Sequence, residues 1–468
     1  MQKYFLQYLV ALILATMLLL SSHEWYEVVA VSVFFFMVYK FVSDLGTDIS
    51  IKNILALICI MQWLLGPVLG YAYNDYINSD YQMHLPKETF FGYALPATLL
   101  QLAGLYLPFG RRPKNLDFKN YPVDCYKKGR FLILLGFLGD LTSLGFVSFI
   151  LGGLKFVGLF YMFASTHPYR KYWLALVFGS IFLTSIGQGM FHDMLLWGSF
   201  FLMMFFWANR KSILVRFSII LAGFFFIMLL QLIKGDYRAT IRVGNPSATS
   251  NVTTFTNMIA EKVTGVESIF APENISQSII RINQGWIVDR VMEHVPEKEP
   301  YAYGSTIWDA VVASIFPRFL MPDKGIAGGR NNMLQYAGIQ LNSNTSMDIS
   351  QIGEAYANFG VAGGIIFMFL YGLFLNWILY FIQKKSLRHP DLIFWVPLIF
   401  LQIVKAETSF MTILNHLTKT ALVTWFFFSS YGEQLFNVWY ARKRVNTPMM
   451  PSIMEDTNKN EEVITPIN

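Results

Sequence analysis

Charged side chains that can bind phosphate gather in one stretch of the chain, residues 234–354. The stretch contains six arginines and twelve acidic residues, so its cations lie among acids rather than forming a general basic surface. Arginine offers two parallel N–H donors to phosphate, and cations stabilise the negative charge that develops on a phosphate leaving group. The residue types therefore favour a site for a substrate that carries phosphate.

The densest group of charges lies in the run IFPRFLMPDKGIAGGRN at 315–331. Its prolines and glycines argue against a long helix and favour a shaped loop. Exposed N–H groups near Gly328 and Gly329 can cradle a phosphate, although the spacing does not match a Walker loop. A surface loop with solvated charges is the alternative. The charged members of the run are Arg318, Asp323, Lys324 and Arg330.

Four further basic residues accompany this run. Lys234 and Arg238 open the stretch, where an anchor at the membrane interface is the alternative role for either one. Arg281 and Arg290 are nine residues apart, which places them half a turn out of phase on a straight helix. They can serve one pocket only if Gly285 bends or breaks the helix between them.

Two side chains in the stretch can exchange a proton with a substrate hydroxyl. Glu354, just before an apolar run, is the first candidate, and its alternative role is that of a helix N-terminal acid favoured by the macrodipole. His294, one helical turn after Arg290, is the second candidate. Aromatic residues can stack on sugar rings but can equally pack in a core; these are Tyr303, Trp308, Tyr336 and Tyr356.

The composition is that of a helical membrane protein. Hydrophobic residues make up 54% of the 468 residues and charged residues 14%, whereas soluble domains are about 25% charged. The apolar segments are continuous rather than alternating, which argues against a transmembrane β-barrel. Cys59 and Cys125 imply no disulfide framework. We find no HExxH or CxxC motif and expect neither a metal nor another cofactor.

Apolar segments of about 20 residues predict the membrane spans. Lys and Arg crowd the loops at 111–130, 210–216 and 384–388 and follow the last span at 442–444, and we expect these loops to be cytoplasmic. Stretch 234–354 then faces outward. The net charge of +6 reports this orientation rather than nucleic-acid binding. The predicted spans are 4–22, 25–41, 54–73, 90–109, 131–164, 173–188, 190–208, 213–233, 358–382, 391–406 and 410–430.

The number of crossings depends on residues 131–164. A tight hairpin of two short helices there gives twelve crossings and places both termini inside, whereas the alternative is a single crossing with an interfacial helix within 173–208. The expected organisation is an all-α polytopic protein with N-terminal spans at 1–233, one large and mostly helical outward loop at 234–354, C-terminal spans at 355–432 and a partly disordered tail at 433–468.

Polar groups also interrupt the apolar parts of the chain, where they usually face the protein interior or a cavity. Lys405 and Glu407 are two residues apart and so lie on different faces of a helix, and each is expected to pair with another group. The other groups of this kind are His192, Asp193, His416 and Lys419.

Four short runs resemble the bacterial oligosaccharide repeat-unit polymerases, the Wzy or O-antigen polymerase family. They are KGDYR at 234–238, the segment from Arg281 to Arg290, IFPRFLMPDKG at 315–325 and IGEAYANFG at 352–360. The layout of many spans around one large outward loop is also similar and covers nearly the whole chain. The first half of the chain contributes only hydropathy to the resemblance.

The resemblance implies a GT-C-like, metal-independent glycosyltransferase in the bacterial inner membrane. Such an enzyme transfers glycan from an undecaprenyl-diphosphate carrier to the non-reducing end of another lipid-linked repeat unit, with a flippase and a chain-length regulator as candidate partners. On this hypothesis Arg318, Lys324 and Arg330 bind the diphosphate, and Lys234 and Arg238 lie near the lipid interface. Asp323 and Tyr356 also belong to the substrate site.

Three other functions remain open at this point. An O-antigen ligase uses the same donor with another acceptor, and the sequence separates the two poorly. A flippase or transporter for lipid-linked glycan often carries two related halves, and the chain shows no internal repeat. A non-catalytic membrane partner of an export machine would tolerate loss of the loop cations one at a time.

Overall fold

The computed structural model describes residues 24–46, 50–109, 124–142, 145–209, 211–243, 248–264, 272–316, 329–342 and 345–439. Within these ranges every regular element is helical, which confirms the all-α class. The predicted span at 4–22, most of the tail and the predicted site residues Arg318, Asp323 and Lys324 lie outside the described residues.

Several helices have the length and composition of membrane spans. Three shorter apolar helices accompany them: His192–Ala208, Ser305–Ile315 and Pro390–Phe400. The chain therefore has the apolar helices of a membrane protein, while twelve crossings and a GT-C-like arrangement stay predictions. The five described helices long and apolar enough to cross a membrane are Trp25–Asp44, Ile51–Ala72, Val147–Ala164, Ile213–Ile241 and Ser350–Ser386.

The first helices are α2 (Trp25–Asp44), α3 (Ile51–Ile60), α4 (Gly66–Ala72) and α5 (Lys87–Tyr106). A π-helical turn at Met61–Leu65 joins α3 to α4. A π-turn disturbs the regular ladder of backbone hydrogen bonds, and here the carbonyl of Gln62 accepts the N–H of Gln284 at 3.1 Å. This bond ties the N-terminal helices to the stretch at 234–354.

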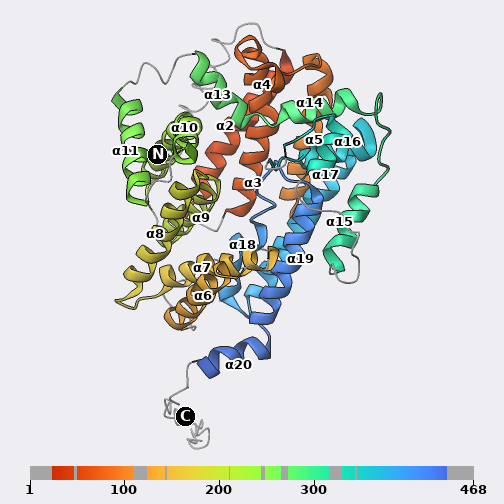
Figure 1. Cartoon of the computed structure of the whole chain (residues 1–468). Coiled ribbons are helices and arrows are strands. Elements are labelled where there is room, and N and C mark those ends of the chain that lie inside the picture. The colour runs from red at the N-terminus through yellow and green to blue at the C-terminus, as the bar shows by residue number, and fades with distance from the viewer. Residues whose placement is uncertain are drawn as a thin grey trace, which may run out of the picture.

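Residues 131–164 form the predicted two-helix hairpin. Its arms, α6 (Cys125–Asp140) and α7 (Phe146–Ala164), pack along each other, and Lys155 pairs with Asp140 across them. In Figure 1 this hairpin lies at the end of the molecule opposite α13 and α14. Two further helices follow, α8 (Arg170–Gln188) and α9 (His192–Ala208). That both arms of the hairpin cross a bilayer stays a prediction.

The stretch at 234–354 is mostly helical in its described parts. The expected domain boundary at 234 falls inside α10 (Ile213–Val243), and the boundary at 354 falls inside α17 (Ser350–Ser386). Figure 1 shows α13 and α14 at the same end of the molecule as α4. The helices between α10 and α17 are α11 (Ala248–Thr264), α13 (Pro272–Ile282), α14 (Gly285–His294), α15 (Ser305–Ile315) and α16 (Arg330–Ala337).

A kink divides α17 into two parts. Gly360 has φ 66° and ψ −161°, a conformation essentially restricted to glycine, and a Cβ there would lie 3.1 Å from the Tyr301 hydroxyl. The short first part, 350–359, is buried from Ser350 to Asn358 although it carries polar side chains. Those side chains must therefore find partners inside the protein.

The predicted span at 391–406 is not one continuous helix. A 3₁₀ turn, Pro390–Trp395, leads into α18 (Val396–Phe400), and residues 401–409 are irregular and largely buried before α19 (Phe410–Phe427) and α20 (Ser430–Trp439). The Thr408 hydroxyl donates to the carbonyls of Gln402 and Lys405 at 3.0 and 2.8 Å, an alternative to helical bonding. Irregular backbone at membrane depth occurs where protein buries it or where it lines a cavity.

Candidate functional site

Four basic side chains from three separate elements gather at one end of α10. Lys234 and Arg238 lie one helical turn apart on that helix. Arg238 and Arg281 are both close enough to the Lys234 ammonium to repel it electrostatically. Lys405 belongs to the irregular segment after α18. Lys405 and Lys234 both interact electrostatically with His192 at the start of α9. We call Lys234, Arg238, Arg281 and Lys405 the cation cluster.

Two carboxylates partly balance this cluster. Asp193 accepts the Lys405 ammonium at 3.2 Å, and Glu407 acts electrostatically on Lys234 and on His192. Four cations against two carboxylates leave a net formal charge of +2 with His192 neutral. An excess of positive charge from several elements is the arrangement that an anionic ligand would neutralise.

The position of the cluster on α10 is fixed by uncharged contacts. The buried Tyr237 hydroxyl bonds the carbonyls of Ile186 in α8 and Asn251 in α11, at 2.9 and 3.3 Å. Arg238 Nε donates to the Gly189 carbonyl at 2.7 Å, just after α8. The guanidinium is therefore held by a backbone oxygen while its charge contributes to the cluster.

Glu354 lies in a closed network instead. It is 1% exposed; Oε2 accepts the N–H of Phe410 at 2.8 Å, and Oε1 accepts the Thr306 hydroxyl at 2.8 Å. The Asn358 amide donates to Thr306 Oγ1 and to the Glu354 carbonyl, both at 2.8 Å. Phe410 is the first residue of α19, so Glu354 meets an unpaired N–H group of a helix N-terminus from across the fold.

A second carboxylate, Asp348, holds the same helix start. It bonds the hydroxyl and N–H of Ser409 and accepts the Ile349 N–H at 3.0 Å. Burial raises the pKa of Asp348, and these hydrogen bonds oppose the rise. We call Asp348 and Glu354 the buried carboxylate pair; their hydrogen bonds join the start of α17 to the start of α19.

Tyr356 and Arg330 occupy contrasting positions. The Tyr356 ring is buried and packs edge-on against Tyr93, with centroids 5.0 Å apart, and close to Tyr301 at 6.3 Å. This is the core-packing alternative to sugar stacking. Arg330 is exposed at the first residue of α16 and does not line the pocket described next.

A cavity of about 610 Å³ opens beside α14. Trp286, Arg290, Glu293 and His294 face it from one side of that helix, because residues four and seven or eight apart share a helix face. The opposite walls are Asp80 and Tyr81, from the loop before α5, and residues 337–342, 345 and 347, at and after the end of α16. We call this cavity the α14 pocket; it contains two predicted site residues, Arg290 and His294.

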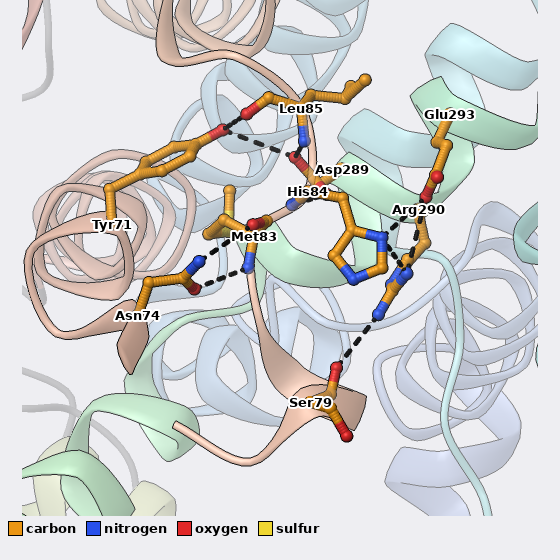
Figure 2. A network of polar contacts seen from close by, with 9 residues as sticks. All are labelled: Tyr71, Asn74, Ser79, Met83, His84, Leu85, Asp289, Arg290 and Glu293. Atoms are coloured by element: carbon orange, nitrogen blue, oxygen red, sulfur yellow. Dashed lines mark hydrogen bonds and ion pairs between the residues drawn. The ribbon is translucent and has the colours of Figure 1, made fainter. Parts of the chain in front are cut away.

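A polar network holds the loop before α5 against α14 (Figure 2). Asp289, fully buried, accepts the N–H groups of His84 at 2.8 Å and Leu85 at 3.1 Å. Arg290 contacts His84 Nδ1 and donates to the Ser79 carbonyl at 3.2 Å. Burial raises the pKa of Asp289 from 3.8 to about 6, while the two N–H groups oppose the rise.

The structure separates the two arginines that a single pocket would have required together. The helix breaks near Gly285, as that hypothesis needed: α13 ends at Ile282 and α14 begins at Gly285. Arg281 nevertheless acts on Lys234 in the cation cluster, whereas Arg290 lines the α14 pocket. The break thus directs the two charges to two different places.

Sequence reasoning did not single out the loop before α5. Asp80 and Tyr81 line the α14 pocket, and His84 joins its network. The available signal was the run YNDYINSDYQMH at 73–84, which is polar and aromatic between two apolar segments. Lys298 and the chain from Gly338 to Asn342 were also missed; their role depends on contacts with α14.

Comparison with known proteins gives one family match. No curated protein and no solved structure matches the chain. A family model described as a domain of unknown function (DUF8712) matches residues 131–384, from within α6 to near the end of α17. This match covers more than half of the chain, including most of the cation cluster and α14, and the chain therefore belongs to the DUF8712 family.

Proposed function

We propose that this protein is a polysaccharide polymerase that transfers glycan from a polyprenyl-diphosphate carrier to another lipid-linked repeat unit. The observation that supports this most is the cation cluster. It combines cations from α10, α13 and the 401–409 segment at the end of a helix long and apolar enough to span a bilayer. A lipid-linked diphosphate presents its charge at that depth.

In the proposed reaction, an acceptor hydroxyl oxygen forms a bond to the anomeric carbon of the donor sugar. The bond from that carbon to the phosphate oxygen breaks, and the diphosphate leaves with the electron pair. Lys234, Arg238 and Arg281 stabilise the charge on the leaving group, so the chain itself supplies what a metal ion supplies elsewhere. Arg318 and Lys324 stay candidates for the same role, and Asp323 stays a candidate for contact with the substrate; all three lie outside the described residues.

The acceptor hydroxyl must also lose a proton. Both Glu354 oxygens already accept hydrogen bonds, from Phe410 and Thr306, whereas His294 faces the α14 pocket. We therefore assign the role of proton acceptor to His294 and give Glu354 a positioning role. This reverses the order of the two candidates drawn from the sequence.

The test is complementation of a deletion strain with variants of the cluster, read as the surface glycan on a gel. Arg281→Ala and Lys405→Ala should give product limited to a single repeat unit at a normal protein level. Lys262→Ala, on α11 in the same outward stretch, is the matched control and should restore long polymer. Wild-type chain length in both cluster variants would contradict the proposal.

One observation favours a second candidate, a transporter for lipid-linked glycan. The helix Pro390–Phe400 gives way to irregular buried chain at 401–409, and transporters use such discontinuous helices at their binding sites. In the same strains a transporter would leave lipid-linked repeat unit on the cytoplasmic face. A ligase would instead leave finished polymer on its lipid carrier.

A further inference from the structure

The α14 pocket is built as a binding site rather than as a surface irregularity. Its volume of about 610 Å³ lies within the range of roughly 300–1,000 Å³ that small-ligand sites occupy. Three parts of the chain form its walls: the loop before α5, α14, and residues 337–342 with 345 and 347. Asp289 and Arg290 bond the first of these walls to the second, which fixes their separation.

The third wall passes closely over α14. Gly338 has φ +67°, and a Cβ at that position would lie 2.9 Å from His294 Nδ1 and 3.0 Å from Cε1. Only glycine therefore lets this chain cross the imidazole in that conformation. Beyond the crossing, Gln340 and Asn342 line the pocket with exposed amide side chains.

The lining suits a ligand with many hydroxyl groups and little net charge. The lining contains Arg290 and Lys298 together with Asp80 and Glu293, so the formal charges cancel when His294 is neutral. Amide side chains and backbone groups of 338–342 add donors and acceptors without charge. The half-buried Tyr81 packs edge-on against the buried Trp286, with centroids 5.0 Å apart, and a tyrosine ring in such a lining can contact the apolar face of a sugar.

The pocket and the cation cluster are linked by short stretches of chain in two places. Arg281 precedes the break between α13 and α14, and Trp286 follows it. On the other wall, Met347 lines the pocket and the next residue, Asp348, bonds Ser409, four residues after Lys405 of the cluster. One polar cavity and one cationic site are thus joined through short, buried segments.

We propose that the α14 pocket binds the acceptor saccharide, a short neutral oligosaccharide, separately from the cationic site that holds the diphosphate of the donor. The role of acceptor rests on the proposed polymerase function; the binding of a saccharide does not. Arg290 and Lys298 bond hydroxyl groups in this assignment, and the half-buried Tyr81 contacts a ring face.

The experiment is a calorimetric titration of the purified full-length protein in detergent. The probe is the host repeat-unit oligosaccharide, released from its lipid by mild acid, with maltotriose as an unrelated saccharide. Saturable binding of the repeat unit is expected, and maltotriose should bind more weakly. Lys298→Ala and Asn342→Ala should each weaken repeat-unit binding about three- to tenfold, the effect of one lost hydrogen bond.

Two controls keep the outcomes separate. Glu297→Ala, exposed next to Lys298 but outside the lining, should bind the repeat unit as wild type does. Arg281→Ala should also retain this binding while losing polymer in cells. Absence of saturable binding, equal binding of maltotriose, or unchanged affinity in both pocket variants would overturn the inference. Wild-type polymer from the cluster variants would instead overturn the proposed function, whatever the titration shows.

Discussion

The buried carboxylate pair and the cation cluster are neighbouring sets of charge, yet they are built in opposite ways. The segment from Lys405 to Phe410 contributes to both. Glu354 is fully enclosed, and each of its oxygens accepts a hydrogen bond. The cluster keeps a net charge of +2, and Arg281 is exposed. Charge in an apolar chain therefore serves structure where opposite or polar groups fully balance it and is available to a ligand where a net charge remains.

Removing the Glu354 carboxylate should have the largest effect of all, and that effect should be a loss of stability. In Glu354→Ala the Phe410 N–H and the Thr306 hydroxyl lose a buried acceptor, which costs about 3–5 kcal/mol of unfolding free energy. Thermal unfolding of the purified protein and its yield after size-exclusion chromatography measure this. Glu297→Ala is the exposed control.

Glu354→Gln sharpens the same comparison. A glutamine can accept the Phe410 N–H through its oxygen and donate to Thr306 Oγ1 through its amide, so the cost should stay within about 1 kcal/mol. A positioning role predicts that this variant still makes long polymer. Normal stability with complete loss of polymer would return Glu354 to the role of base.

The next effect concerns the wall of the α14 pocket and depends on pH. The folded pKa of Asp289 is raised from 3.8 to about 6, so the folded state binds this proton more tightly than the unfolded chain does. Its contribution to stability therefore falls as pH rises from about 4 to 6, by up to about 3 kcal/mol. Melting temperatures of wild type and Asp289→Asn across that range measure it. The variant should show the flatter profile, and parallel profiles would contradict the assignment.

The fold class was accessible from the sequence because it depends on local composition. Continuous apolar runs predicted helices, and the apolar run at 131–164 was long enough for two of them. The first arm ends at Asp140 and the second begins at Phe146, so Gly152 and Gly153 lie inside α7 and do not form the turn. The break after Phe400 was not predicted, because Leu401, Ile403 and Val404 continue the apolar run. The irregular path of residues 401–409 depends on distant partners, including the Gln351 side chain, whose amide donates to the Lys405 carbonyl at 3.1 Å.

The candidate site was predictable in residue type but not in grouping. The sequence marked Lys234, Arg238 and Arg281 as candidate site cations by residue type. Only the packing of α13 against α10 brings the three together. Glu354 shows the converse. Its partners lie 48 and 56 residues away in the chain, and no local pattern reveals that they already satisfy it.

A smaller effect should appear when one cation is removed from the cluster. Arg281→Ala should weaken binding of inorganic pyrophosphate to the purified protein about tenfold, since a hydrogen bond to a charged group contributes about 1.5–3 kcal/mol. The pyrophosphate affinity of Arg281→Lys should fall between those of the wild type and Arg281→Ala, because lysine keeps the charge and loses the planar guanidinium. Calorimetry in low salt measures both variants. Lys262→Ala should bind pyrophosphate as wild type does, and equal weakening there would reduce the cluster to a general charge effect.

The smallest effect should come from the Asp193 carboxylate, and its sign separates the two regions most directly. Asp193 is 56% exposed in its side chain, so its pairing with Lys405 is screened by solvent, and Asp193→Asn should change the unfolding free energy by less than about 1 kcal/mol. The same substitution raises the net charge of the cluster from +2 to +3 and frees Lys405 for a ligand. Pyrophosphate should then bind about threefold more tightly, a gain that added salt should reduce. If Asp193→Asn instead lowers both stability and affinity, Asp193 holds Lys405 in place as Glu354 holds α19, and the cluster would be a structural network like its neighbour.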